Sequence, residues 1–227
     1  MRSTGPEEGR SRRDPSGENS GPEIQFHPQY ALSTGALYGN NKVFLLPSAD
    51  LYLLACLNSP LLWWFNWRNL PHMKDEALNP AGFLMETLPI AEPTADLRRE
   101  AEEHTARVLE LAKASQAQTR ELLDWLRHAH AIDKPGQKLE AYAGLAADAF
   151  AAEVRQRRPK SQPRLNPAAL AELKRVHESY ALPERQRRAE MAKRERRLAD
   201  LVNQAYGLSE EEVALMWRTA PPRMPGK

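Results

Sequence analysis

The side chains that could do chemistry are few, and each lies in a context that favours a structural role. Cys56 sits inside an apolar run without the histidine context of a nucleophile, which is typical of a buried thiol. His128 and His130 are two residues apart on an expected helix, so they point to different faces and do not form a metal pair. Glu172-Leu173-Lys174 has the carboxylate–x–lysine ending of a nuclease site but lacks the preceding acidic strand. With no Gly-rich phosphate loop either, the sequence predicts no catalytic, cofactor-binding or metal-binding residue and favours a helical binding module over an enzyme.

The charge distribution is uneven along the 227 residues. The net charge is +2. Residues 1–149 carry 15 basic and 20 acidic side chains, whereas residues 150–227 carry 17 and 10. A basic C-terminal third is suited to contact with nucleic acid, and a solvated helical face is the alternative interpretation. A single cysteine and an N-terminus without an apolar leader lead us to expect a reducing, cytoplasmic location.

The most apolar stretch, residues 50–69, organises the N-terminal part of the chain. Its apolar residues recur at helical spacing, with a break at Asn58-Ser59-Pro60. Ser59 is suited to cap a helix whose first turn contains Pro60, and Asp50 favours an earlier helix start. We therefore expect two short buried helices joined by a corner. The polar interruptions make the stretch too short to span a membrane, so no membrane partner is expected.

The remaining elements indicate a mainly α fold with a small β-hairpin near the N-terminus. Residues 1–22 are polar and rich in Gly and Pro, and we expect them to be disordered. Residues 24–46 contain short apolar runs around a turn at 39–41, which predicts the hairpin. Helical periodicity with an interrupted a/d stripe predicts a long helix from residue 94 to about 130, with weak packing or a bend at its polar middle.

Four further helices and a tail complete the predicted order. A helix over 138–154 is followed by one from Asn166-Pro167 and by another that Pro183 opens, and Ser209 with Glu212 caps the last. This gives four regions: a disordered 1–22, an α+β region at 23–92, a helical domain at 93–218 and a disordered tail at 219–227.

Three stretches together resemble one enzyme family. The first is QYALSTGALYGNNKVFLLPSADLYLLACLNSPLLWWF at 29–65, the second is Leu88-Pro89-Ile90, and the third runs from Asp200 to Val213. They are similar, in this order, to the end of the target-recognition domain and the terminal helices of type IIG restriction–modification enzymes and adenine-specific DNA methyltransferases. Residues 23–92 would then be a partial target-recognition domain, that is, an α+β remnant of a specificity domain.

The resemblance covers only the non-catalytic part of that family. The Asn-Pro-Pro-Tyr motif that holds the flipped adenine is absent, because Asn79-Pro80 and Asn166-Pro167 are each followed by Ala. Ser33 and Pro60 replace a usual Asp and a usual Lys. The resemblance implies a C-terminal part, from a truncated gene or a separate subunit, that does not methylate DNA alone. S-adenosylmethionine would bind the missing catalytic half and not this chain.

The partner expected from this resemblance is double-stranded DNA. The alternatives are a helical module that docks on a separate methyltransferase subunit, and a non-functional remnant. Polar and basic residues near the predicted turn and the apolar helices would lie near the groove, and the basic segment after residue 154 would contact phosphates. The predicted nucleic-acid-binding residues are Tyr38, Asn40, Asn41, Lys42, Arg68, Lys74, Arg155, Arg157, Arg158 and Lys160.

Overall fold

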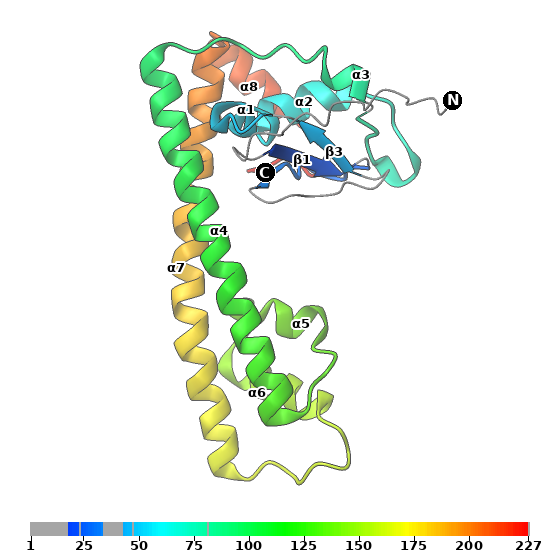
Figure 1. Ribbon diagram of the computed structural model, residues 1–227, viewed down its shortest axis with the longest axis vertical. Helices are drawn as coiled ribbons and strands as arrows, with labels where there is room; N and C mark the ends of the chain where they lie inside the picture. The colour runs from blue at the N-terminus through cyan, green and yellow to red at the C-terminus, as the bar shows by residue number, and fades with distance from the viewer. Residues whose placement is uncertain (1–17, 23, 34–42, 47, 81, 227) are drawn as a thin grey trace, which may run out of the picture. The chain divides into compact units, whose positions relative to one another are not determined.

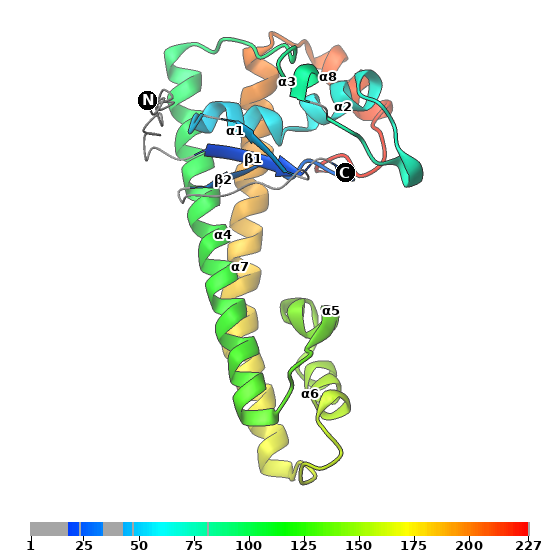
Figure 2. The same ribbon diagram turned by 45° about the vertical axis from the view of Figure 1, so that its right-hand side comes forward.

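The computed structural model describes residues 18–22, 24–33, 43–46, 48–80 and 82–226. The described chain is mainly helical with a small β element, which confirms the predicted fold class (Figures 1 and 2). The chain divides into two compact units, which are described separately below. The first unit combines Met1–Glu102 with Leu201–Lys227, and the second is Glu103–Asp200. This division differs from the predicted boundary at 92/93, since the C-terminal residues belong with the first unit.

The β element is a three-stranded antiparallel sheet in the order β2-β1-β3. Its strands are β1 (Glu18–Pro22), β2 (Ala31–Ser33) and β3 (Val43–Leu46). The predicted pairing was wrong, because β2 and β3 both pair with β1 instead of with each other. Expected disorder was also wrong for 18–22. Strand pairing uses backbone groups, so a polar Ser/Gly/Pro segment can pair on both edges although its composition does not indicate a strand.

The predicted pair of short helices is confirmed. Helix α1 (Leu51–Leu57) begins where Asp50 accepts hydrogen bonds from the N–H groups of Tyr52 and Leu53. Helix α2 (Pro60–Asn69) begins where Ser59 accepts from the N–H of Leu62. The Asn58 side chain holds the corner between the two helices in place, because it accepts a hydrogen bond from the N–H of Tyr30 and donates one to the carbonyl of Tyr30. Helix α1 buries Tyr52 and Leu54 to Leu57, and α2 buries Leu62, Trp63 and Asn66.

The C-terminal tail packs against α2, which contradicts the predicted disorder of 219–227 for its described part. Trp63 on α2 is buried and donates from Nε1 to the Pro222 carbonyl at 3.1 Å. Met224 is 3% exposed and joins the same apolar cluster, together with Met216 of α8 (Glu210–Arg218). A backbone carbonyl is present at every residue, so composition does not reveal this contact. Between α2 and residue 93 lie the short helices η1 (Lys74–Glu76) and α3 (Gly82–Met85).

The second unit is built on parts of two long helices that lie side by side (Figures 1 and 2). These are α4 (Ala95–His130) and α7 (Pro167–Ala205), and between them in sequence come α5 (Gly136–Glu140), η2 (Tyr142–Gly144) and α6 (Ala147–Arg157). The predicted single helix over 138–154 is thus broken near Gly144, a poor helix former. The break leaves Leu139, Tyr142 and Phe150 fully buried in the core of this unit.

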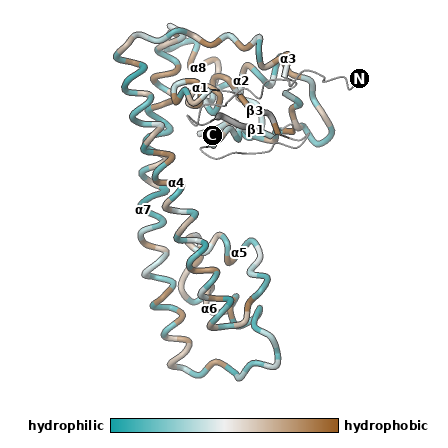
Figure 3. Tube along the Cα trace, in the orientation of Figure 1, coloured by the Kyte–Doolittle hydropathy of each residue, from teal (hydrophilic) through white to brown (hydrophobic). Residues whose placement is uncertain are grey.

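Helix α7 runs through Pro183, where the sequence led us to expect a new helix. An interior proline removes one backbone hydrogen bond and costs about 3 kcal/mol. Apolar residues on both sides of it, Leu173 and Ala181 before and Leu198 after, are buried. Burial of these side chains on both sides of Pro183 offsets the local cost. Figure 3 shows long hydrophilic stretches along α4 and α7 between their apolar positions, as expected for helices with one buried face.

Candidate nucleic-acid interface

Four of the predicted DNA-contacting residues cannot be placed. Tyr38, Asn40, Asn41 and Lys42 lie outside the described residues. The structure places the other six, and it separates those that hold the fold from those that are free to meet a ligand.

Arg68 is committed to the fold of the first unit. Its Cζ lies 3.8 Å from the centroid of the Trp64 ring, a cation–π contact. Its Nη1 donates to the Trp64 carbonyl at 2.9 Å, and its Nη2 donates to the Thr219 carbonyl at 2.9 Å. The guanidinium therefore ties the end of α2 to the end of α8. A guanidinium used in this way has little capacity left for reading a base edge.

Lys74 is exposed in η1 and has no acidic partner among the described residues. Asp75 and Glu76 follow it directly, and both have φ of 61°. Positive φ is unfavourable for residues other than glycine, so this turn is strained. Two adjacent carboxylates offset the single positive charge. Lys74 is therefore a poor phosphate contact.

Arg157 is also part of the fold. It lies in the last turn of α6, where its Nε donates to Oε1 of Glu153 at 2.6 Å and its Nη1 donates to the Lys134 carbonyl at 3.3 Å. The Glu153 side chain is only 8% exposed, and Lys138 Nζ lies 3.4 Å from Oε2. The hydrogen bond from Arg157, together with the charges of Lys138 and Arg157, lowers the pKa of Glu153 despite its burial. Removing Arg157 would leave a buried carboxylate with only one lysine.

Arg158 closes the turn that follows α6. Its Nη1 donates to the Pro163 carbonyl at 2.9 Å, and its Nε is buried without a partner in the described structure. Burial, with a smaller contribution from the positive charge of Arg158, lowers the pKa of His130. Arg158 thus shapes the segment that carries the neighbouring cations.

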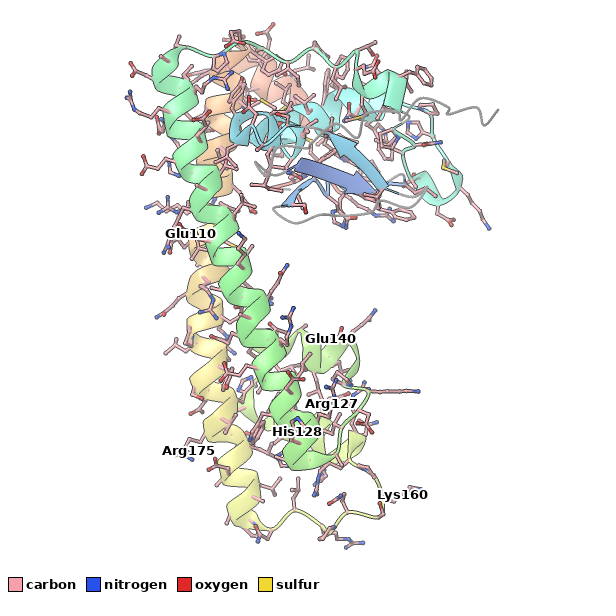
Figure 4. The ribbon with its side chains drawn as sticks, in the orientation of Figure 1. Glu110, Arg127, His128, Glu140, Lys160 and Arg175 are labelled. Atoms are coloured by element: carbon pink, nitrogen blue, oxygen red, sulfur yellow. The ribbon has the colours of Figure 1, made fainter. Side chains whose placement is uncertain are left out.

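In the segment after Glu153, the cations without a partner among the described residues are Arg155, Lys160 and Arg164. All three are exposed, and none has a hydrogen bond or ion pair to another described residue. Figure 4 places Lys160 on the connection between α6 and α7. No acidic residue occurs between Glu153 and Glu172 in the sequence. The second unit therefore presents a short basic segment without acidic residues, defined here as residues 155–164, in which Arg155, Lys160 and Arg164 have no carboxylate partner in the described structure.

A polar layer between α4 and α7 was missed by the sequence reasoning. Glu184 is 1% exposed and accepts from Arg187 Nη2 at 3.1 Å and Arg188 Nε at 2.7 Å. Arg187 also donates to Ser115 and to Gln118 of α4. Burial alone raises the pKa of Glu184, but hydrogen bonds from Arg188, Ser115 and Arg187 outweigh it and leave the pKa below its ordinary value. The polar middle of the a/d stripe is therefore a hydrogen-bonded layer between α4 and α7.

Gln118 extends this layer to η2. Its Nε2 donates to Tyr142 Oη at 2.8 Å and to the Tyr180 carbonyl at 2.7 Å. The signal for this arrangement was present in the sequence, since Ser115 and Gln118 occupy a and d positions. Polar residues at such positions specify the register of paired helices.

The cysteine and the potential metal ligands are the other groups that could do chemistry. Cys56 is fully buried, and burial raises its pKa to about 11, so the thiol stays protonated at neutral pH. Among the described residues there is no group of three or more His, Cys, Asp or Glu side chains with metal-binding geometry. Within the same residues, no helix has the length and apolar content needed to cross a bilayer.

Comparisons with known proteins add one match. Residues 94–202 match a family model described as a domain of unknown function (DUF8810). The match covers α4, the short helices and nearly all of α7, so it coincides with the helical region that contains the polar layer and the basic segment. The comparisons found no matching curated protein and no matching solved structure.

Proposed function

We propose that this chain is a non-catalytic DNA-binding module that contacts duplex phosphates through the basic segment. The observation that carries this proposal is the absence of intramolecular partners, among the described residues, for Arg155, Lys160 and Arg164. Many cations of α4 and α7 have a carboxylate within 4 Å, including Arg107, Lys174 and Arg188. The basic segment departs from that pattern.

Contacts of this kind give affinity without sequence reading. Lys and Arg neutralise phosphates whatever the base sequence, and the released counterions make the affinity depend on salt. The resemblance of residues 29–65 and 200–213 to the specificity part of adenine-specific methyltransferases supports a DNA partner. On this proposal the chain works in the cytoplasm beside a methyltransferase that supplies the S-adenosylmethionine site and the adenine clamp.

Fluorescence anisotropy with a labelled duplex tests this proposal. The isolated chain should bind with a Kd on the order of 10⁻⁴–10⁻⁶ M at physiological salt. Changing Arg155, Lys160 and Arg164 together to Ala should reduce the slope of log K against log salt by up to about 2.7, at roughly 0.9 for each phosphate that is no longer neutralised. A control variant with Lys74, Lys113 and Arg218 changed to Ala removes the same charge from other exposed sites. Equal slopes in the two triple variants would exclude the basic segment as the DNA-binding surface.

The second candidate function is docking on a methyltransferase subunit, and exposed apolar side chains in the first unit favour it. Phe83 is 69% exposed, and Ile24, Phe26 and Met73 are each 41–44% exposed. Backbone bridges join Gln25 and His72 to Leu78, which brings the segments around Ile24, Phe26 and Met73 together. Phe83→Ser should weaken co-purification with a methyltransferase subunit that carries the Asn-Pro-Pro-Tyr half, while leaving DNA affinity unchanged. Unaltered co-purification of that variant would count against docking through Phe83.

A further inference from the structure

A surface cavity of about 370 Å³ lies in the second unit where α7 passes the start of α6. It is distinct from the basic segment and plays no part in the proposed DNA contact. Its walls combine apolar, acidic, basic and imidazole groups: Ala146, Ala147, His177, Glu178, Ala181, Leu182 and Arg185. Such a combination of opposite charges around an apolar wall limits the chemistry that can fill the cavity.

His177 contributes a buried acceptor without a partner. The residue is 1% exposed, and its Nε2 lies 3.0 Å from the Tyr142 carbonyl oxygen. A carbonyl only accepts, so Nε2 carries the hydrogen and, in the neutral ring, Nδ1 carries a lone pair. That Nδ1 is buried with no hydrogen-bond partner in the described structure, and the Phe150 ring lies 4.8 Å away and holds the imidazole in place. A buried acceptor of this kind calls for a donor from water or a ligand.

The start of α6 contributes backbone N–H groups. Ala146 occupies the N-cap position, where its methyl side chain cannot accept a hydrogen bond. Asp148, in the first turn, pairs with Lys174 instead of capping the helix. The first N–H groups of this 11-residue helix therefore lack a side-chain acceptor in the described structure. Together with the helix dipole they favour a bound anion.

Arg185 and Glu178 supply fixed charges of opposite sign on one face of α7. The Arg185 guanidinium is positioned by donation from Nε to the Ala143 carbonyl at 2.7 Å and from Nη2 to the Leu145 carbonyl at 2.9 Å. These bonds leave Nη1 for a ligand close to the start of α6. Glu178 is exposed and has no ion pair with another described residue. Leu182, 58% exposed, extends the apolar wall.

We propose that this cavity binds a zwitterionic α-amino acid with an aliphatic side chain. The ligand carboxylate meets Arg185 and the N–H groups at the start of α6. Its ammonium group donates to Glu178 and to Nδ1 of His177, which satisfies the orphaned acceptor. Its side chain lies against Ala181 and Leu182. A simple anion would not provide a hydrogen-bond donor for Glu178 and Nδ1 of His177. A simple amine would not provide an acceptor for Arg185 and the N–H groups at the start of α6.

Isothermal titration calorimetry on the full chain with three probes tests the assignment. L-leucine carries all three groups, 3-methylbutylamine lacks the carboxylate, and 4-methylpentanoate lacks the ammonium group. Leucine should bind, and each analogue should bind at least about tenfold more weakly, because each lacks one charged hydrogen-bonding group. No heat of leucine binding up to about 10 mM would mean that water alone fills the cavity, and this would overturn the proposal.

Two variants assign the contacts of the ammonium group and of the carboxylate separately. Glu178→Gln changes an exposed side chain and should weaken leucine about tenfold while leaving 4-methylpentanoate unaffected. Glu140→Gln is its matched control, since Glu140 is also exposed and lies outside the cavity lining. Arg185→Gln should weaken leucine and 4-methylpentanoate alike, with a thermal melt to verify folding. Leucine affinity that is unchanged by Glu178→Gln, or matched by 4-methylpentanoate, would overturn the ammonium contact and with it the proposal.

Discussion

In the first unit, aromatic side chains donate hydrogen bonds to backbone carbonyls of distant segments, whereas in the second unit a network of polar side chains joins the middle of α4 to α7. Tyr52 Oη donates to the Ala91 carbonyl at 2.9 Å, Trp63 Nε1 donates to the Pro222 carbonyl, and Tyr206 Oη donates to the Pro89 carbonyl at 2.6 Å. In the second unit, Glu184 and Gln118 anchor a network of side chains. The first arrangement fixes where segments end, and the second fixes the register of paired helices.

The basic residues also divide into those that bond within the fold and those that do not. Arg68, Arg157 and Arg187 each satisfy groups of the fold, and Arg155, Lys160 and Arg164 satisfy none in the described structure. A basic residue is therefore a candidate for DNA contact only after its intramolecular bonds have been accounted for. Four predicted outcomes, from the largest to the smallest effect, test this contrast.

Trp63→Ala should destabilise the first unit by about 3–5 kcal/mol, as expected for truncating a fully buried aromatic side chain. The variant also leaves the Pro222 carbonyl without its donor, so the tail should become more susceptible to proteolysis. Urea denaturation and limited proteolysis measure the two effects. Trp63→Phe is the control that keeps an aromatic ring in the core but removes the N–H and part of the side-chain volume. A loss below about 0.5 kcal/mol for Trp63→Ala would mean that α2 and the tail are not packed as described.

Glu184→Ala should destabilise the second unit by about 1–3 kcal/mol, because it removes a buried acceptor and leaves Arg187 without its carboxylate. The pKa of Glu184 is lowered in the folded state, so its stabilising contribution is present above the ordinary glutamate pKa. That contribution is lost as the pH falls from the ordinary pKa through the lowered one. Urea denaturation at several pH values should show this loss in the wild type and a weaker pH dependence in Glu184→Gln. Parallel pH profiles of the two proteins would contradict a stabilising role for the Glu184 carboxylate.

Arg68→Ala should cost about 1 kcal/mol, since it removes a cation–π contact and two bonds to carbonyls from an exposed guanidinium. It should leave the salt dependence of DNA binding unchanged. Arg68→Lys keeps the charge but loses the planar fork, and it should destabilise almost as much. A reduced salt slope with unaltered stability would reassign Arg68 to DNA contact.

Arg155→Ala should change the stability by less than about 0.5 kcal/mol, as for surface substitutions without specific contacts. Arg157→Ala, two residues further along the same helix, should destabilise measurably because Glu153 loses its closest partner. Thermal melts of the two variants, which carry identical charge, compare them directly. If both variants lose the same stability, the distinction between Arg155, which has no partner in the described structure, and Arg157, which bonds to Glu153, would be contradicted.

Local features of the fold were predictable because their signals lie within a few residues of one another. Asp50, Ser59 and Pro60 specify the starts of α1 and α2, and Ser209 with Glu212 forms the predicted capping box of α8. The a/d spacing along α4 indicated one long helix. The predicted helix start at Pro183 was wrong, because the local cost of a proline is apparent from the sequence and the burial of side chains on both sides of it is not. The basic segment of the candidate interface could be located from charge alone. Which of its arginines form hydrogen bonds within the fold could not be predicted from the sequence.

The sequence by itself determined the helical class, the capped helix starts, the apolar corner at Asn58-Ser59-Pro60 and the acid-free stretch between Glu153 and Glu172. These depend on side-chain type and short-range spacing. Only the tertiary structure decided that β1 separates β2 from β3, that the tail carbonyl of Pro222 meets Trp63, and that Arg157 and Arg158 serve the fold. Those outcomes depend on backbone groups that every residue carries and on partners far away in sequence, so residue type alone could not single them out.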